Sequence, residues 1–136
     1  MHDGRTVAQS GILPYRTRNG EIEVLLVTSS TRKRWIIPKG HIEPNMTARD
    51  SAAKEAYEEA GVRGRVQHVP LGRYRHDSPQ EPAVVEVYLM EVETVLAAWP
   101  EAHRRERRWM RLHEARDHIL ETGLKQLLDH LAELIY

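Results

Sequence analysis

The sequence of 136 residues contains neither cysteine nor phenylalanine. Without cysteine, the chain has no disulfide framework, no thiol nucleophile and no cysteine-based zinc site. Its 20 basic and 20 acidic side chains leave no net charge, so it lacks the excess of one sign that attracts nucleic acids or membrane surfaces wholesale. No apolar run approaches a membrane span, and residues 1–4 do not begin a signal peptide. We therefore expect a soluble cytoplasmic protein that binds neither nucleic acid nor membrane.

The residues that are present suffice for one small domain. Hydrophobic residues make up 40% of the chain and charged residues 29%, which are ordinary proportions for a globular protein. A chain of this length has the usual size of one domain and is long enough to bury a core. No repeat, low-complexity tract or linker divides it. We therefore expect a single domain over residues 1–136.

The spacing of apolar residues predicts strands flanked by helices. Strands are expected at 6–14, 21–28, 35–37 and 83–95, one or two within 62–75, and a short one at 107–112. Helices are expected at 48–60, 113–120 and 123–135, the last with a stripe of leucine and isoleucine. Turns are expected at 16–20 and 77–82. Strands and helices in this order indicate an α/β (α+β) sandwich around a central mixed β-sheet.

The most informative segment runs from residue 38 to 62, where three carboxylates share one face of a predicted helix capped by Thr47. Glu55, Glu58 and Glu59 lie at positions i, i+3 and i+4, while alanines occupy a separate face. Three like charges at this spacing repel one another. A bound Mg²⁺ or Mn²⁺ would relieve the repulsion, because both cations prefer carboxylate oxygens. Taken alone, the spacing is also typical of a solvated acidic interaction helix without a metal.

The residues around these carboxylates resemble the Nudix box. Its pattern is glycine, five residues, glutamate, seven residues, arginine and glutamate, an aliphatic residue, any residue, two glutamates, any residue, glycine and an aliphatic residue. The positions in register are Gly40, Glu55, Ala56, Glu58, Glu59, Gly61 and Val62. Two positions depart from the pattern: Met46 stands where the first glutamate is expected, and Lys54 where the arginine is expected.

The resemblance extends beyond the box to residues 35–40, 43–44, 108–109 and 114–115, which are similar to the branch with diphosphoinositol and diadenosine polyphosphate hydrolases. It implies a Nudix-type α/β/α sandwich that uses Mg²⁺ or Mn²⁺ to hydrolyse a pyrophosphate bond in a small polyphosphorylated molecule. The favoured substrates are dinucleoside polyphosphates and diphosphoinositol polyphosphates. By the same resemblance, Glu55, Glu58 and Glu59 bind the catalytic cations with the Gly40 carbonyl, and Glu55 or another carboxylate activates the attacking water.

The two departures bear on activity. Met46 cannot form an ion pair, while Lys54 keeps its charge but lacks the bidentate fork of arginine. Because both members of the pair change, no glutamate is left facing a missing arginine. We expect either a less well organised loop or a site held by other contacts, with the metal carboxylates intact. The alternative is a catalytically weak Nudix-fold module that binds a nucleotide or regulates without hydrolysis.

Basic side chains occur where a polyphosphate groove is expected. The phosphate-binding candidates are Arg32, Arg34, Lys39, Arg73 and Arg75. Arg73 and Arg75 alternate along a predicted strand and so share a face. Each of these residues is equally compatible with an ordinary solvated position.

Other candidates depend on the fold. Glu86 and Glu106 are candidates for an additional carboxylate at the metal site. Trp35 and Trp109 are expected in the core rather than stacked on a base, whereas Tyr88 fits a core or a pocket. The apolar stripe of the last helix would serve a homodimer as well as a core, so a monomer and a homodimer both remain open.

Overall fold

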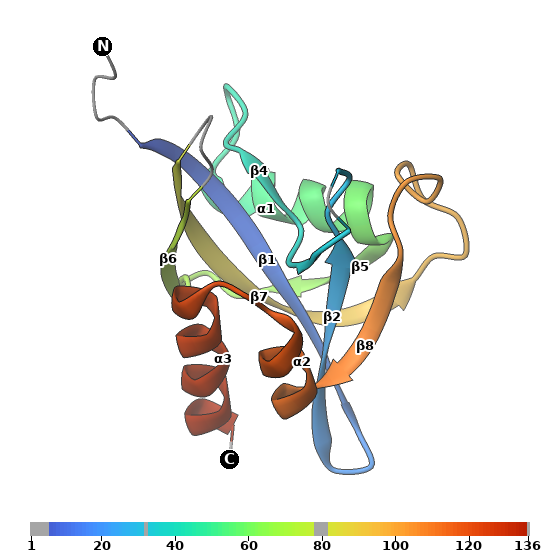
Figure 1. Cartoon of the computed structure of the whole chain (residues 1–136). Coiled ribbons are helices and arrows are strands. Elements are labelled where there is room, and N and C mark those ends of the chain that lie inside the picture. Colours follow the sequence, from blue (N-terminus) through green and yellow to red (C-terminus); the bar gives the residue numbers. More distant parts are fainter. Residues whose placement is uncertain (1–5, 32, 78–81, 136) are drawn as a thin grey trace.

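The strands form one mixed sheet, shown in the computed structural model of Figure 1, which describes residues 6–31, 33–77 and 82–135. The strands in these ranges are β1 (Val7–Arg18), β2 (Glu21–Thr28), β3 (Trp35–Ile36), β4 (Lys39–His41), β5 (Val62–Val66), β6 (Gly72–His76), β7 (Ala83–Val95) and β8 (Arg107–Arg111). The helices are α1 (Ala48–Glu55), its π-helical continuation η1 (Ala56–Ala60), α2 (Leu112–His118) and α3 (Thr122–Ile135). The predicted order of strands and helices is confirmed, and β4 is an addition to it.

The sheet is built on the parallel pair β1–β7, whose register runs from Val7 opposite Ala83 to Tyr15 opposite Glu91. The path through the sheet is β3-β2-β1-β7-β5, and off this path β4 pairs with β1, β6 with β7 and β8 with β2. All of these other pairs are antiparallel. Because both strand directions occur in one sheet, the predicted mixed sheet is confirmed.

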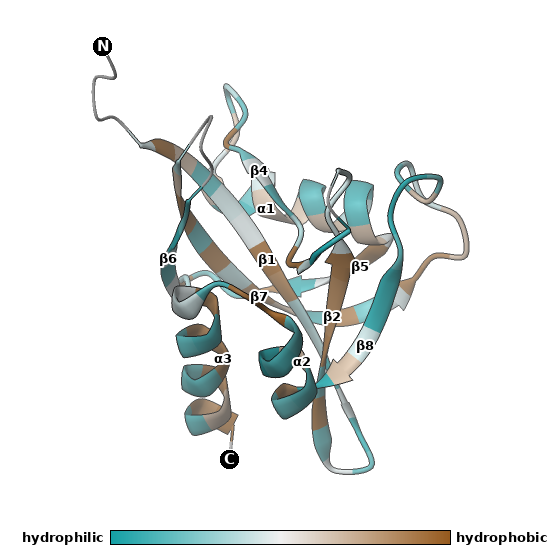
Figure 2. Cartoon of the chain, in the orientation of Figure 1, coloured by the Kyte–Doolittle hydropathy of each residue, from teal (hydrophilic) through white to brown (hydrophobic). Residues whose placement is uncertain are grey.

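Alternate side chains of the central strands pack into two cores, one on each face of the sheet. Ile12 and Tyr88 belong to the core beneath α1 and η1, whereas Leu13 and Leu89 belong to the core beneath α2 and α3. This division follows from the alternation of side chains along a strand. Figure 1 shows α1 on one side of the sheet and α2 and α3 on the other, and Figure 2 shows hydrophobic positions along the sheet between these layers. The predicted α/β/α sandwich is confirmed.

The large aromatic side chains support these cores. Trp35 packs partly against the core beneath α2 and α3, and Trp109 partly against the core beneath α1. Arg16 stacks over the Trp109 ring, 4.0 Å from its centroid. Tyr88, which the sequence left open, is 6% exposed and lies in the core beneath α1.

The turn between β1 and β2 is shorter than the predicted one at 16–20. β1 continues to Arg18, and the turn is Asn19-Gly20, both with positive φ (53° and 77°). Two such residues form the tight hairpin turn that matches the twist of the strands. Pro14 does not end the strand because it lies between the segment of β1 that pairs with β4 and the segment that pairs with β2. The predicted end of the first strand was therefore wrong.

The acidic helix begins as predicted, with the Thr47 hydroxyl accepting a hydrogen bond from the Asp50 amide at 3.0 Å. Its regular α-helical part ends at Glu55, however, and the last five residues form the wider π-helical turn η1. Gly61 ends the segment in the left-handed conformation, with φ of 65°. The prediction of an uninterrupted α-helix was thus wrong for residues 56–60. Such turns occur frequently at functional sites.

α3 covers one end of the sheet with a stripe of leucines. Leu124, Leu127, Leu128 and Leu131 are buried in the core, whereas Ile135, predicted in the same stripe, is 42% exposed. Among the described residues, neither α3 nor another helix is long and apolar enough to cross a bilayer.

Candidate active site

Gly40 lies directly against the carboxylate of Glu55. The short strand β4 pairs Gly40 with Ser10 of β1, which fixes the position of the glycine next to the acidic helix. A Cβ atom at Gly40 would lie 2.6 Å from Glu55 Oε1, closer than real contacts allow. A larger residue at position 40 would therefore displace the Glu55 carboxylate from its present place.

Glu59 is buried beside Glu55. It is 4% exposed, its carboxylate is hydrogen-bonded to Glu55, and its Oε1 accepts from the Lys39 amide at 3.4 Å. Burial, followed by the hydrogen bond to Glu55, raises the pKa of Glu59 to about 9, although Arg105 acts in the opposite direction. Without a cation, Glu59 therefore keeps its proton at neutral pH.

The donor set at this point fits a divalent cation. Oxygen atoms are supplied here by Glu55, Glu59 and the backbone of Gly40. A divalent cation would relieve the repulsion between the two carboxylates, which otherwise keeps Glu59 protonated. Glu58 lies on the same segment but pairs with Lys54, with 2.6 Å between Oε1 and Nζ. Within the described ranges, no three acidic or imidazole side chains already meet as a metal cluster. The site thus brings two of the three predicted carboxylates together.

The segment after β7 closes the end of the carboxylate helix. The Trp99 indole donates to the Glu59 carbonyl at 3.0 Å. Arg107 donates to the carbonyls of Ala60 and Leu96 at 2.9 and 2.7 Å, and its guanidinium stacks on the Trp99 ring. These contacts satisfy carbonyls that the helix end leaves without partners. These contacts with the backbone at the end of the helix hold Glu59 in position.

Arg105 is a largely buried cation next to Glu59. The sequence did not distinguish it from the other arginines of the segment 104–108. Its side chain is 10% exposed and lies 3.7 Å from Glu59 Oε1. It also donates to Glu101 at 2.7 Å and to the Thr28 carbonyl at 2.9 Å. Glu101 is tied to the helix as well, because its amide donates to the Glu58 carbonyl at 3.0 Å. No local pattern connects these two residues with the site, since their contacts with Glu58, Glu59 and Thr28 join positions more than 40 residues apart.

Glu59 also lines a cleft of about 970 Å³, called here the polar cleft. Three of the predicted phosphate-binding residues, Arg34, Lys39 and Arg75, line it together with Arg105. Burial lowers the pKa of the Lys39 amine, so this cation is partly removed from solvent. The structure brings these cations and Glu59 to one opening.

The other predicted site residues lie elsewhere. Arg73 pairs with Glu86 at 3.0 Å, and the Tyr88 hydroxyl donates to Glu86 at 2.6 Å. The Tyr88 bond, followed by Arg73, lowers the pKa of Glu86, and neither Arg73 nor Glu86 lines the polar cleft. Glu106 is exposed, with its amide bonded to Thr28. Arg32 lies outside the described residues.

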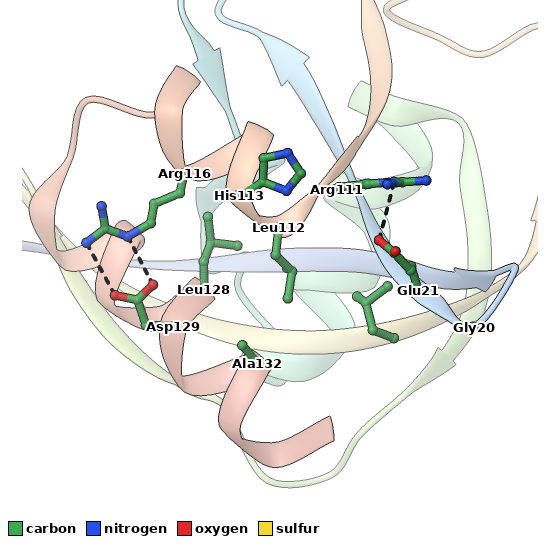
Figure 3. Close-up of a pocket in the computed structure, with 10 residues that line it drawn as sticks. Gly20, Glu21, Arg111, Leu112, His113, Arg116, Leu128, Asp129 and Ala132 are labelled. Carbon is green, nitrogen blue, oxygen red and sulfur yellow. Dashed lines mark hydrogen bonds and ion pairs between the residues drawn. The ribbon is translucent and has the colours of Figure 1, made fainter. Parts of the chain in front are cut away.

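A second groove, of about 610 Å³, lies between the β1–β2 hairpin and the helices α2 and α3 (Figure 3). Its arginines already have acidic partners: Arg116 lies 3.0 Å from Asp129, and Arg111 lies 3.4 Å from Glu21. Figure 3 shows both pairs at the rim of the groove. None of the predicted site residues that the structure describes lines this groove.

Comparison with known proteins decides the family. Residues 5–131 match the NUDIX domain. The chain belongs to the Nudix family. It is 35% identical to "Nudix hydrolase 18, mitochondrial" of Arabidopsis thaliana over 132 residues, 90% of this chain and 74% of that protein. It is 36% identical to diphosphoinositol polyphosphate phosphohydrolase 2 of Rattus norvegicus over 98 residues, 70% of this chain and 53% of that protein. The chain is therefore a Nudix hydrolase.

Solved Nudix structures share its fold. The Ap4A hydrolase of C. elegans superposes with a TM-score of 0.79 at 21% identity, covering 97% of this chain and 100% of that one. The NUDIX domain of Shewanella oneidensis NrtR, solved with ADP ribose, superposes with a TM-score of 0.73 at 16% identity, covering 97% and 90%. At these identities the likeness shows the fold, and the predicted Nudix sandwich is confirmed.

The departures from the Nudix box are connected in space. Lys54, at the arginine position, lies 2.6 Å from Glu43 Oε1 as well as 2.6 Å from Glu58 Oε1. Met46, at the glutamate position, is in the same turn as Glu43, because its amide donates to the Glu43 carbonyl at 3.1 Å. The two carboxylates raise the pKa of Lys54, Glu43 first, so it remains charged. Glu43 thus supplies the loop carboxylate that Met46 lacks.

The pairing of Glu43 with Lys54 predicts that one substitution lowers activity and that a second one restores it. Glu43→Gln is expected to lower kcat/KM about 10-fold, because Lys54 then loses the partner that balances its pull on Glu58. Adding Met46→Glu to Glu43→Gln is expected to restore most of that loss. The melting temperature should change little, since the ion pairs are exposed and such pairs contribute little stability. Steady-state kinetics at several Mg²⁺ concentrations would measure both effects, and a double variant no faster than Glu43→Gln would contradict the exchange of roles.

The raised pKa of Glu59 predicts a pH dependence of stability. Between the ordinary value of 4.5 and about 9, the folded chain keeps a proton that the unfolded chain releases. The free energy of unfolding without metal therefore falls as pH rises through this window. Melting temperatures in EDTA at about pH 6 and about pH 8.5 would measure the fall. Glu59→Gln, which cannot titrate, should show a smaller fall, and an equal fall in both proteins would refute the assignment to Glu59.

Proposed function

We propose that this Nudix hydrolase uses a divalent cation, Mg²⁺ or Mn²⁺, to hydrolyse a pyrophosphate bond in a small polyphosphorylated molecule. The observation that supports this proposal is the contact of Glu55 with both Gly40 and the buried Glu59, which lines a cleft that also holds cations. A dinucleoside polyphosphate or a diphosphoinositol polyphosphate is the proposed substrate class, in keeping with two of the proteins that this chain resembles.

Glu55, Glu58 and Glu59 would hold the cation, together with the Gly40 carbonyl. A cation bound there would supply charge neutralisation of the phosphates and a bound water of lowered pKa. Glu55, which is less buried than Glu59, would orient the attacking water and accept its proton. The contacts of Trp99 and Arg107 behind the helix keep these carboxylates from moving apart as charge develops.

The phosphate chain would lie against Arg34, Lys39 and Arg105 in the polar cleft. Arg105 is already fixed by Glu101 and the Thr28 carbonyl, so little side-chain entropy would be lost when it meets a phosphate oxygen. Lys39 presents a partly buried amine beside Glu59. These three cations would position the scissile bond next to the carboxylate pair.

A panel of phosphorylated molecules tests the proposal. The full chain, with Mg²⁺ or Mn²⁺, would be incubated with Ap4A, a diphosphoinositol polyphosphate and ADP ribose, and products would be separated by anion-exchange chromatography. Cleavage that depends on the cation and stops with EDTA is expected for at least one of the three. Tight, cation-dependent binding with no cleavage would instead favour the nucleotide-binding module.

Two further expectations stay predictions. A cytoplasmic location is proposed from the composition, and cell fractionation would test it. Both a monomer and a homodimer remain proposed, and light scattering of the purified chain would distinguish them.

A further inference from the structure

Ser10 of β1 carries a buried hydroxyl without a partner. Ser10 is 0% exposed, and within the described residues its Oγ atom makes no hydrogen bond. The other buried serine and the buried threonine of the described ranges are bonded. Ser51 donates to the His41 carbonyl at 3.3 Å, and the Thr28 hydroxyl accepts from the Glu106 amide at 2.9 Å. Because burial of an unbonded hydroxyl costs free energy, the hydroxyl of Ser10 calls for a partner.

The alternation of side chains along β1 places this hydroxyl on the face of the sheet that α1 covers. A Cβ at the next residue, Gly11, would meet Ile37 and Val85, which belong to the core beneath α2 and α3. Ile12, two positions from Ser10, belongs to the core beneath α1 and η1. The register of β1 against β7 runs without a shift through these residues, so neighbouring side chains lie on opposite faces. The side chain of Ser10 consequently faces α1.

On that face, Ser10 is a neighbour of the Glu55 carboxylate. Ser10 and Gly40 are directly opposed in the antiparallel pair of β1 and β4. Side chains of opposed residues point to the same face, with Cβ positions about 5 Å apart, and the Cβ position of Gly40 lies 2.6 Å from Glu55 Oε1. Because Gly40 has no side chain, residue 40 does not separate the hydroxyl from the carboxylate. A rotation of the glutamate side chain or one bridging water can close the remaining gap.

We propose that Ser10 is a positioning residue, whose hydroxyl donates a hydrogen bond to the Glu55 carboxylate, directly or through one water, when a divalent cation is bound there. A carboxylate has two oxygens, so one can bind the cation while the other accepts from Ser10. Such a hydrogen bond fixes the orientation of a metal-binding side chain, and its loss typically weakens metal affinity about 10- to 100-fold. The inference rests on the proposed function, because it requires a cation at Glu55.

A purely structural role of Ser10 predicts a different result. If the hydroxyl only fills space, Ser10→Ala removes an unbonded polar group, and the melting temperature should rise with no change in cation binding. If the hydroxyl orients Glu55, the same variant should be at least as stable as the wild type in EDTA but should bind the cation more weakly. Cation affinity therefore separates the two roles, whereas stability does not.

Binding of Mn²⁺ to the full chain without substrate tests the proposal. Free Mn²⁺ would be measured by electron paramagnetic resonance in titrations of the wild type, Ser10→Ala, Ser10→Thr and Ser10→Val. Glu55→Gln, which should lose most of the binding, would identify the part that belongs to this site. Ser10→Ala and Ser10→Val are expected to raise the dissociation constant about 10-fold, whereas Ser10→Thr should stay within about 3-fold of the wild type. Threonine and valine are both β-branched, so their difference isolates the hydroxyl from the added bulk.

Hydrolysis by the same proteins separates failure of this inference from failure of the proposed function. A wild type that binds Mn²⁺ but cleaves no polyphosphate would refute the proposed function, while a weaker affinity of Ser10→Ala would still support the positioning role. A folded Ser10→Ala protein with the wild-type Mn²⁺ affinity would overturn that role, as would a folded Ser10→Thr protein that binds as weakly as Ser10→Val. A wild type that binds no Mn²⁺ at Glu55 would overturn both.

Discussion

Replacement of Glu58 by glutamine is expected to lower kcat/KM by at least about 100-fold while the chain stays folded. Glutamine keeps the shape of the side chain but removes the negative charge that Lys54 holds at 2.6 Å. A neutral amide oxygen binds a divalent cation far more weakly than a carboxylate does. The ion pair lies partly in solvent, so its loss should cost little stability.

Kinetics with Mg²⁺ and a thermal melt of the same samples would measure both parts of this prediction. The matched control is Glu93→Gln, the same change at an exposed position of β7, which should leave rate and melting temperature unaltered. A folded Glu58→Gln protein with the wild-type rate would remove Glu58 from the catalytic group.

Gly64→Ala is expected to have the largest effect on stability, about 3 kcal/mol. β5 and β7 pair with a shift of register between Arg63 and Gly64, and a Cβ at Gly64 would overlap the carbonyl oxygen of Glu91. Backbone atoms of a paired strand cannot rotate away as a side chain can. The pair must therefore separate locally, and its hydrogen bonds must weaken.

Urea unfolding would measure the loss. Gly20→Ala is the comparison, since Gly20 has open space around it but a φ of 77°, so only the backbone penalty of about 1–2 kcal/mol is expected. Equal losses at the two glycines would show that the steric overlap at Gly64 is relieved without cost.

The regular parts of the fold follow from the sequence because local patterns determine them. The alternation along residues 83–95, the leucines of α3 and the Thr47 cap each depend on neighbours within a few positions. The errors concern features that only packing determines. β4 has three residues and exists because Gly40 pairs with β1, and the π-helical turn η1 has the composition of an ordinary helix.

The candidate site likewise contains residues that the sequence predicts and residues that it does not predict. The spacing of glycine and glutamate predicts a site at Glu55, Glu58 and Glu59, because these residues share one helical segment, and the structure brings Glu55 and Glu59 together. Arg105 was missed, since its partner Glu59 lies 46 positions away. Of the arginines at alternate positions of β6, Arg75 lines the polar cleft whereas Arg73 turns to Glu86, and spacing alone does not separate them.

The position of Arg107 in the chain has a consequence for synthesis on the ribosome. The carboxylate helix ends at Gly61, but its last carbonyls receive the guanidinium of a residue that emerges 46 to 47 positions later. An N-terminal part of the chain can form the hairpin and the helix while it is still being translated. The helix end of such a partial chain lacks its contacts with Arg107, Trp99 and Arg105, so these residues cannot hold the carboxylates in position. We therefore expect the contacts of the helix end with Trp99, Arg105 and Arg107 to form only after these residues have left the exit tunnel.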